Sequence, residues 1–107
     1  MERVQTDTRE HMLLYFTSGT TGYPKMVVHN HRYALAHIQT AAHWQNVDSD
    51  GVHLTISDTG WGKAAWGKLF GQMSLGACVF VYDFDKFIPT DMLRIMQNYK
   101  ITSFCAP

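Results

Sequence analysis

Tyr15-Phe16-Thr17-Ser18-Gly19-Thr20-Thr21-Gly22-Tyr23-Pro24-Lys25 is the stretch around which this sequence is organised. An apolar run ends at Phe16, and small hydroxyl residues, two glycines and a lysine follow it. Glycine lets the backbone turn sharply and bring its N–H groups close to an anion. Four hydroxyl groups and the mobile charge of Lys25 add further donors. The composition of this stretch therefore indicates a phosphate-binding loop.

This loop differs from the Walker A motif, in which Gly-Lys-Ser/Thr leads directly into a helix. Here Pro24 precedes Lys25, and the residues Met26-Val27-Val28 are typical of a strand. Loop amides and hydroxyls, rather than a helix N-terminus, would have to bind the anion. The residues alone leave a second interpretation open, namely a Thr- and Gly-rich hairpin turn with a solvated lysine.

Residues 17–25 resemble, residue type for residue type, the phosphate-binding signature of the adenylate-forming (AMP-binding) enzymes. That superfamily contains acyl-CoA synthetases, the adenylation domains of peptide synthetases, and luciferases. The segments 57–61, 63–66 and 76–81 look most like the short- and medium-chain acyl-CoA synthetases. The resemblance covers nearly the whole chain and implies an internal part of the N-terminal domain of such an enzyme.

The resemblance also implies roles for individual residues. Lys25 is the implied catalytic residue. The implied ATP phosphate-binding residues are Thr17, Ser18, Gly19, Thr20, Thr21, Gly22 and Lys25. Gly60 and Trp61 are implied to line the acyl-substrate pocket, and no residue is implied as a metal ligand.

Three residues near these sites also have structural interpretations. Trp61 follows a predicted strand at its carboxyl end, where α/β sheets place ligands, but a core tryptophan is the alternative. Trp66 is expected in the core, and His29 is expected to be a structural histidine. Asp58 could cap the helix that follows it or orient the loop, and the cap is the preferred interpretation.

The implied reaction has two steps. A carboxylate and ATP give an acyl-adenylate and pyrophosphate, and the thiol of coenzyme A then displaces AMP; Mg²⁺ would share the phosphate charge. Two alternatives stay open: a non-catalytic phosphate-binding or self-associating α/β module, and part of a carrier-protein-dependent adenylation domain. Later motifs of the family are not found in these 107 residues, so the isolated chain is expected to be inactive.

Composition limits the other classes of function. Nine basic and nine acidic residues balance, so the chain has no basic footprint for nucleic acid or for a membrane surface. No apolar run reaches the ~18 residues of a membrane span, and no signal region is visible. Cys78 and Cys105 lie in apolar runs, which favours buried free thiols in a reducing, cytoplasmic setting. The six histidines lack the spacing of a zinc site.

Periodicity predicts an α/β fold of mainly parallel βαβ units. The resemblance implies that residues 1–107 are a partial AMP-binding domain, an incomplete part of a larger domain. Residues 1–10 are expected to be a flexible lead-in. The expected strands cover 12–17, 26–29, 52–56, 77–82 and 101–105, and the expected helices cover 31–46, 62–75 and a segment from Pro89. Asn30 and Thr90 are expected helix caps. The apolar run 77–82 predicts a strand buried on both faces. Such open strands predict self-association of the chain.

Overall fold

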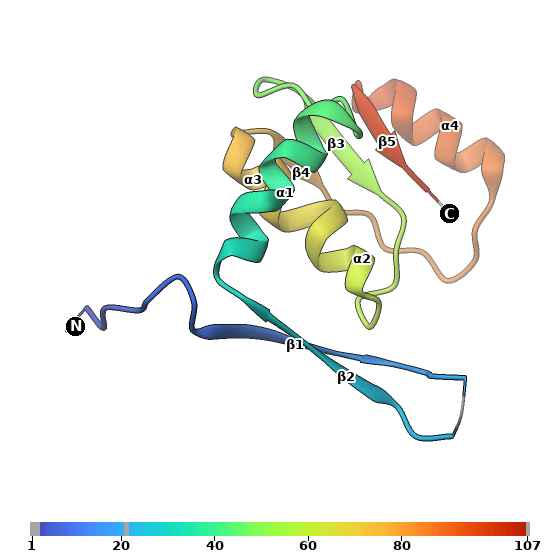
Figure 1. The fold of residues 1–107 in the computed structure, drawn as a ribbon. Coiled ribbons are helices and arrows are strands. Elements are labelled where there is room, and N and C mark those ends of the chain that lie inside the picture. Colours follow the sequence, from blue (N-terminus) through green and yellow to red (C-terminus); the bar gives the residue numbers. More distant parts are fainter. Residues whose placement is uncertain (1–2, 21, 107) are drawn as a thin grey trace.

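The computed structural model describes residues 3–20 and 22–106, which form a hairpin, a three-stranded sheet and the helices around it (Figure 1). The elements are β1 (His11–Thr17), β2 (Lys25–Asn30), α1 (Arg32–His43), β3 (Val52–Thr55), α2 (Gly62–Ala64), the π-helical segment η1 (Ala65–Phe70), α3 (Gly71–Leu75), β4 (Cys78–Phe80), α4 (Pro89–Asn98) and β5 (Ser103–Cys105).

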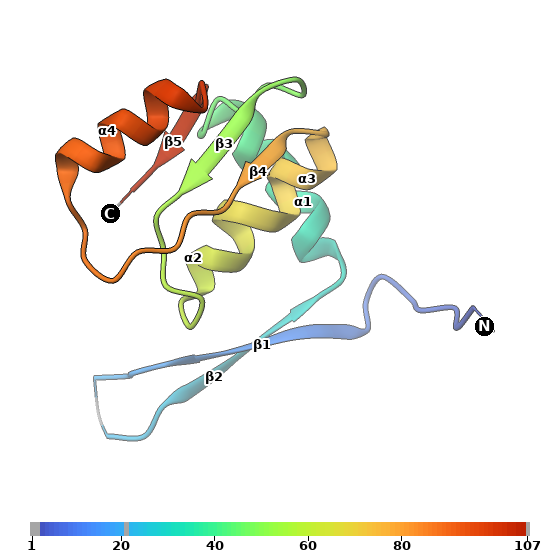
Figure 2. The same cartoon turned by 180° about the vertical axis from the view of Figure 1, so that it is seen from behind.

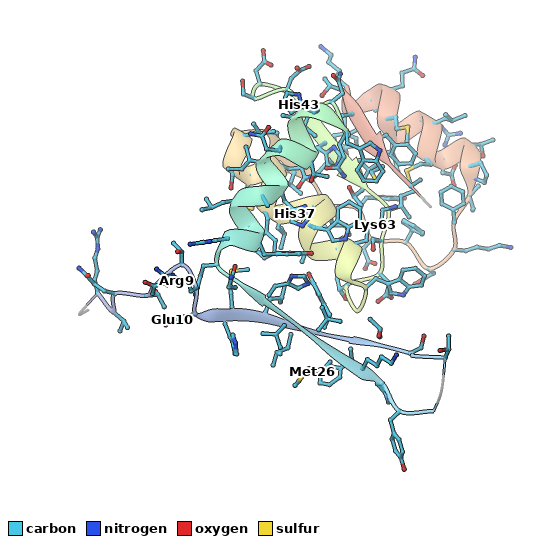
Figure 3. All side chains as sticks on the ribbon, in the orientation of Figure 1. Arg9, Glu10, Met26, His37, His43 and Lys63 are labelled. Carbon is cyan, nitrogen blue, oxygen red and sulfur yellow. The ribbon has the colours of Figure 1, made fainter. Side chains whose placement is uncertain are left out.

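The first two strands form an antiparallel hairpin in which Tyr15 pairs with Val27 and Thr17 pairs with Lys25. Both predicted strands are therefore confirmed. The hairpin lies across one end of the remaining elements (Figure 1), and Met26 is 59% exposed on it (Figure 3). The hairpin thus holds the Gly- and Thr-rich loop at its tip, away from the sheet.

Helix α1 begins at Arg32 with His31 as its N-cap, so the expected Asn30 cap lies one residue too early. The backbone N–H of Arg32 donates to Oδ1 of Asn30 over 3.1 Å, which satisfies one of the free amides at the helix start. The helix ends at His43, three residues before the predicted end. Asn46 has a φ of 51°, a left-handed conformation that stops the helix.

Strands β4, β3 and β5 form a parallel sheet in that order, so the predicted α/β class with parallel strands is confirmed. The chain moves outward from β3 to β4 and then crosses β3 to reach β5. The two connections, from β3 to β4 and from β4 to β5, run toward opposite edges of the sheet. Because both crossovers are expected to be right-handed, their helices should lie on opposite faces of the sheet. Accordingly, α1 and α3 lie on one face and α4 on the other (Figures 1 and 2).

The prediction for residues 77–82 is wrong in length and in burial. Strand β4 covers only Cys78–Phe80, with Cys78 exposed and Val81 77% exposed. The strand lies at an edge of the sheet, where no further strand of the described residues pairs with it. Cys78 and Cys105 are free thiols as expected, but neither is buried.

The predicted helix over 62–75 is helical throughout but is not one α-helix, because a π-helical segment separates α2 from α3. Gly71 explains the close packing of this segment on α1. A Cβ at Gly71 would lie 2.2 Å from the carbonyl oxygen of His37 and 2.6 Å from Cβ of Ala41. Only glycine permits this approach.

Helix α4 starts at Pro89 with Ile88 as its N-cap, so the expected Thr90 cap is wrong. Proline suits the first helical position, where its missing N–H is no loss. Met92 is buried, whereas its neighbour Leu93 is 65% exposed.

The buried centre of the chain is small and partly polar. Ala41, Val47 and Ala77 form the apolar cluster, while His53 and Gln72 are fully buried polar residues. Within the part of the chain that the structure describes, no helix has the length and apolar character needed to cross a bilayer.

Candidate functional site

The loop over 18–24 connects β1 to β2 through two glycines with positive φ, 55° at Gly19 and 102° at Gly22. A Cβ at Gly19 would lie 3.0 Å from the carbonyl oxygen of Tyr23, so the loop closes too tightly for a side chain there. A positive φ at both positions lets the loop turn sharply and is a conformation that glycine adopts without strain. Thr21 lies outside the described residues.

Thr17 and Lys25 close the base of this loop. They form the last pair of the hairpin, and the Thr17 hydroxyl donates to the Lys25 carbonyl oxygen over 3.5 Å. Ser18 and Thr20 are exposed, as is the Lys25 side chain. The structure therefore gathers donors and one positive charge at the tip of an open hairpin.

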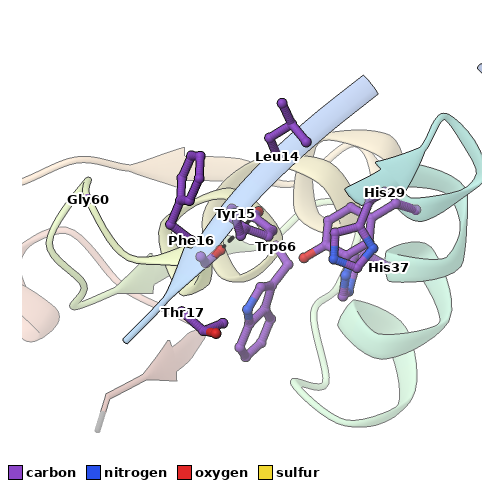
Figure 4. Close-up of a pocket in the computed structure, with 10 residues that line it drawn as sticks. Leu14, Tyr15, Phe16, Thr17, His29, His37, Gly60 and Trp66 are labelled. Atoms are coloured by element: carbon purple, nitrogen blue, oxygen red, sulfur yellow. Dashed lines mark hydrogen bonds between the residues drawn. The ribbon is translucent and has the colours of Figure 1, made fainter. Parts of the chain in front are cut away.

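A cavity of about 550 Å³ lies between the hairpin, α1 and the start of the helical segment after β3 (Figure 4). Its size lies within the ~300–1,000 Å³ of small-molecule sites. Its lining residues are Leu14, Tyr15, Phe16, Thr17, His29, Tyr33, His37, Gly60, Gly62 and Trp66. Thr17 of the loop and Gly60, which sequence assigned to an acyl pocket, thus border one cavity.

Aromatic rings form much of the cavity wall. The His29 and Tyr33 rings lie 4.1 Å apart between centroids, and Tyr33 meets His37 edge-on at 4.4 Å. Tyr15 contacts both His29 and Tyr33 in edge geometry, and its hydroxyl donates to the Gly62 carbonyl oxygen over 3.4 Å. The hairpin and α1 are joined through these rings.

Two ionisable groups in this wall, His37 and Tyr33, have pKa values shifted toward the neutral form. Burial lowers the pKa of His37, and the charge of His29 lowers it further. Burial also raises the pKa of Tyr33, with a smaller contribution from the Tyr15 hydroxyl. Desolvation penalises the charged form in each case. His37 and Tyr33 therefore place no charge against an aromatic or apolar group in the cavity.

Asp58 orders the turn between β3 and α2 instead of capping the helix. Its Oδ1 accepts the N–H of Gly60 over 2.7 Å, and its carbonyl accepts the N–H of Trp61 over 3.1 Å. Trp61, not Asp58, occupies the N-cap position of α2. The preferred cap interpretation of Asp58 is wrong, because the turn intervenes.

Trp61 and Trp66 lie in different surroundings. Trp61 is 68% exposed and is not among the described residues that line the cavity. Trp66, expected in the core, lines the cavity, as does His29. Trp66 follows Gly62 by one helical turn and shares its face, a spacing that could have located it.

Behind the cavity, His53 fixes the π-helical segment to the sheet. Its Nδ1 lies 2.7 Å from Ser103 Oγ, and its Nε2 lies 2.7 Å from Thr55 Oγ1 and 3.0 Å from the Gly67 carbonyl oxygen. The Thr55 hydroxyl donates to the same carbonyl over 2.5 Å. These bonds are mutually consistent when Nε2 carries the proton and the Ser103 hydroxyl donates to Nδ1.

Among residues 3–20 and 22–106, no three His, Cys, Asp or Glu side chains gather in a way that could hold a metal ion. None of these described residues is therefore assigned to Mg²⁺.

Comparison with known proteins gives consistent matches. The family model described as "AMP-binding enzyme" matches residues 1–107. The mitochondrial acyl-coenzyme A synthetase ACSM3 of Homo sapiens is 40% identical over 104 residues, which are 96% of this chain and 18% of that protein. ACSM4 of Homo sapiens is 39% identical over 105 residues, with 97% and 18% covered. The chain thus spans 18% of the length of these relatives.

A solved structure agrees in fold. The acyl-CoA synthetase of Brucella canis superposes with a TM-score of 0.87 at 23% identity, covering 99% of this chain and 19% of that one. An anthranilate CoA ligase in complex with anthranoyl-AMP gives a TM-score of 0.79 at 21% identity, over 97% and 20%. At these identities the superpositions show the fold alone. Because the family model matches residues 1–107 of this chain, the chain belongs to the AMP-binding enzyme family.

Proposed function

We propose that this chain is the ATP phosphate-binding segment of an acid–thiol ligase, an acyl-CoA synthetase that makes an acyl-adenylate and then a thioester with coenzyme A. The single observation that carries the proposal is the hairpin tip beside the cavity. There Thr17 and Lys25 close a loop of left-handed glycines, and Thr17 also borders the cavity that Gly60 lines. Its 40% identity to an acyl-coenzyme A synthetase supports the same activity.

In this proposal the loop binds the β- and γ-phosphates of ATP. Its amides and the hydroxyls of Ser18 and Thr20 are donors, and the charge of Lys25 stabilises the negative charge that develops as pyrophosphate leaves. Hydrogen bonds to a charged phosphate are roughly twice as strong as neutral ones. Mg²⁺, when bound, would neutralise phosphate charge. The described residues include no cluster of side chains that could hold a metal ion, and no step of the proposal depends on Mg²⁺.

The carboxylic acid binds in the cavity next to the loop. A carboxylate must approach the α-phosphorus to attack it, so the acid needs a site that borders the phosphate loop. The cavity lined by Thr17, Gly60 and Trp66 meets that requirement. Trp61, exposed at the start of α2, remains a predicted acyl-site residue and would have to act from the rim.

Replacement of Lys25 tests the proposal in a full-length protein that carries this chain. Lys25→Ala should slow ATP–pyrophosphate exchange about 10²–10³-fold, the usual effect of losing one electrostatic contact to a transition state. Lys86→Ala is the matched control, since Lys86 is an exposed lysine outside the loop. Equal exchange rates for both variants would remove Lys25 from the chemistry.

The cellular compartment of the protein is also a proposal. The sequence predicts the cytoplasm, whereas the names of ACSM3 and ACSM4 place those relatives in mitochondria.

Self-association is proposed from the outer edges of β4 and β5, which no strand covers within the described residues. Sedimentation at micromolar concentration tests it, and a monomer would refute it.

A further inference from the structure

We propose that Tyr15 is a positioning residue for acyl-adenylate formation, which holds the phosphate loop at a set distance from the turn that leads from β3 into α2. This inference rests on the proposed function, because it needs ATP in the loop and the acid in the cavity beside it. Tyr15 belongs to β1 and lines that cavity. It lies between the two sites without being part of the loop or of the turn.

The hydroxyl of Tyr15 connects the hairpin to the start of α2. It donates to the Gly62 carbonyl oxygen over 3.4 Å, the bond that Figure 4 draws as a dashed line. Among the described residues, no other hydrogen bond joins the hairpin to an element that follows α1. The position of the hairpin relative to α2 therefore depends on this one hydroxyl more than on any other polar group.

The ring of Tyr15 has neighbours from three other elements. It meets His29 of β2 edge-on with a centroid distance of 5.6 Å, and it meets Tyr33 of α1 in the same way at 6.1 Å. On the side of α2, a Cβ built at Gly62 would lie 3.5 Å from the ring, which is ordinary van der Waals contact. Edge-to-face geometry is favoured between neighbouring rings. Contacts within the protein thus hold the ring, and the hydroxyl points from a defined place.

Tyr15 is close to both sites along the chain. It lies two residues before Thr17, which closes the base of the loop and borders the cavity. At about 3.3 Å of rise for each strand residue, the two Cα atoms are about 7 Å apart. Gly62, the partner of the hydroxyl, follows Gly60 of the predicted acid site by two residues. Few freely rotating bonds therefore separate the loop from the acid site along this path.

Formation of the adenylate makes this distance important. A carboxylate oxygen forms a bond to the α-phosphorus of ATP, while the bond from that phosphorus to the bridging oxygen of pyrophosphate breaks and this oxygen leaves with the electron pair. The reacting atoms must be about 3–3.5 Å apart, and a misplacement of about 1 Å can cost about 10²-fold in rate. A hairpin free to tilt against α2 would change that distance.

The length of the bond fits a group that acts during the reaction. At 3.4 Å it is longer than is usual for a hydroxyl donor. Hydrogen bonds that serve catalysis are often long in a structure without substrate and tighten in the reactive complex. The Tyr15 hydroxyl can therefore draw the loop and the turn together when both substrates bind.

The test separates the two steps of the reaction in the full-length protein that carries this chain. Adenylate formation is measured by ATP–pyrophosphate exchange, with the linear acid from acetate to dodecanoate that the wild type activates best. Thioester formation is measured separately, from coenzyme A and the added acyl-adenylate of that acid.

Tyr15→Phe keeps the ring and removes only the hydroxyl. It should lower kcat for exchange about 10–100-fold, because the reacting atoms are less well aligned. KM for ATP should stay nearly unchanged, since every donor of the loop is still present. Thioester formation from the added acyl-adenylate should keep its wild-type rate, because the β- and γ-phosphates have already left.

Tyr99→Phe is the matched control. It removes the same hydroxyl from a tyrosine that is 59% exposed at the end of α4 and does not line the cavity. Both steps should keep their wild-type rates in this variant. Tyr15→Leu also removes the ring contacts with His29 and Tyr33, so it should lower exchange further than Tyr15→Phe does.

The outcomes separate the role of Tyr15 from the proposed function. Loss of exchange with intact thioester formation supports the positioning role. Exchange at the wild-type rate in Tyr15→Phe overturns that role and leaves the proposed function standing. Equal losses in both steps also overturn it, because a protein that is merely less stable would be slower in each. A folded wild-type protein that activates none of these acids overturns the proposed function itself.

Discussion

Nε2 of His53 lies 3.0 Å from the carbonyl oxygen of Gly67, across the gap between strand β3 and the π-helical segment. This contact joins the centre of the sheet to the residue that follows Trp66. In a π-helix the regular hydrogen-bond pattern is shifted, and such segments are frequent at functional sites. Here side chains of β3 bind a carbonyl of that segment, so a buried polar network holds one wall of the cavity.

Replacement of His53 should cost stability. His53→Leu removes the ring that bonds to Ser103, Thr55 and Gly67, so each of these three groups loses one hydrogen bond. A hydrogen bond lost at a buried site costs about 1–3 kcal/mol, so the free energy of unfolding should fall by about 2–4 kcal/mol. Urea unfolding at fixed protein concentration measures it. His43→Ala, on an exposed histidine at the end of α1 (Figure 3), should stay within about 0.5 kcal/mol.

Stability should also fall in mild acid. Burial lowers the pKa of both His53 and His37 below the ordinary value of 6.5 that the unfolded chain retains. Below pH 6.5 the unfolded state therefore binds more protons than the folded state, and the free energy of unfolding decreases as the pH falls. Each such histidine contributes a slope of at most about 1.4 kcal/mol per pH unit.

Urea unfolding between pH 7 and pH 5 measures this slope. Replacing one of the two groups, as in His37→Phe, should make the dependence on pH shallower, whereas His43→Ala should leave it as it is. A free energy of unfolding that stays constant over this range would mean that neither histidine is neutral because of burial.

The hairpin and the alternation of helices and strands could be predicted because local sequence determines them. An apolar run, a Gly- and Thr-rich turn and Val27-Val28 specify two strands and their connection whatever lies around them. The start of α1 is equally local, since the Asn30 side chain bonds to an amide two residues on. Such features need no knowledge of the rest of the fold.

Burial and the cavity wall could not be predicted in the same way, because they depend on the order of the strands. The run at 77–82 has the composition of a central strand, but β4 pairs only with β3 and its other edge is open within the described residues. Trp61 and Trp66 differ in place because a turn ordered by Asp58 precedes α2. That turn leaves the first ring at the surface and carries the second into the cavity.

Gly71 gives a sharp test of the packing between α1 and α3. In Gly71→Ala the new methyl group would meet the His37 carbonyl oxygen at 2.2 Å, and a backbone atom cannot yield as a flexible side chain does. Overpacking of this kind costs about 1–3 kcal/mol, which should appear in the free energy of unfolding. Gly62→Ala is the control, because its nearest neighbour, the Tyr15 ring, lies at an ordinary 3.5 Å. A stable Gly71→Ala protein would mean that the two helices lie further apart than described.

The isolated 107-residue chain should release no pyrophosphate from ATP, Mg²⁺, butyrate and coenzyme A. Its phosphate loop is open to water: Thr17, Ser18, Thr20 and Lys25 are all exposed, and Tyr23 at the tip is 91% exposed. Charges attract each other far more weakly in water than in a site from which water is excluded. Lys25 alone at an exposed tip therefore cannot hold the phosphates firmly or stabilise the charge that develops on them. Pyrophosphate release is measured against a blank without protein and against Lys25→Ala. Release above both would show that the hairpin and cavity are a sufficient active site, and that the loop needs no further cover to act.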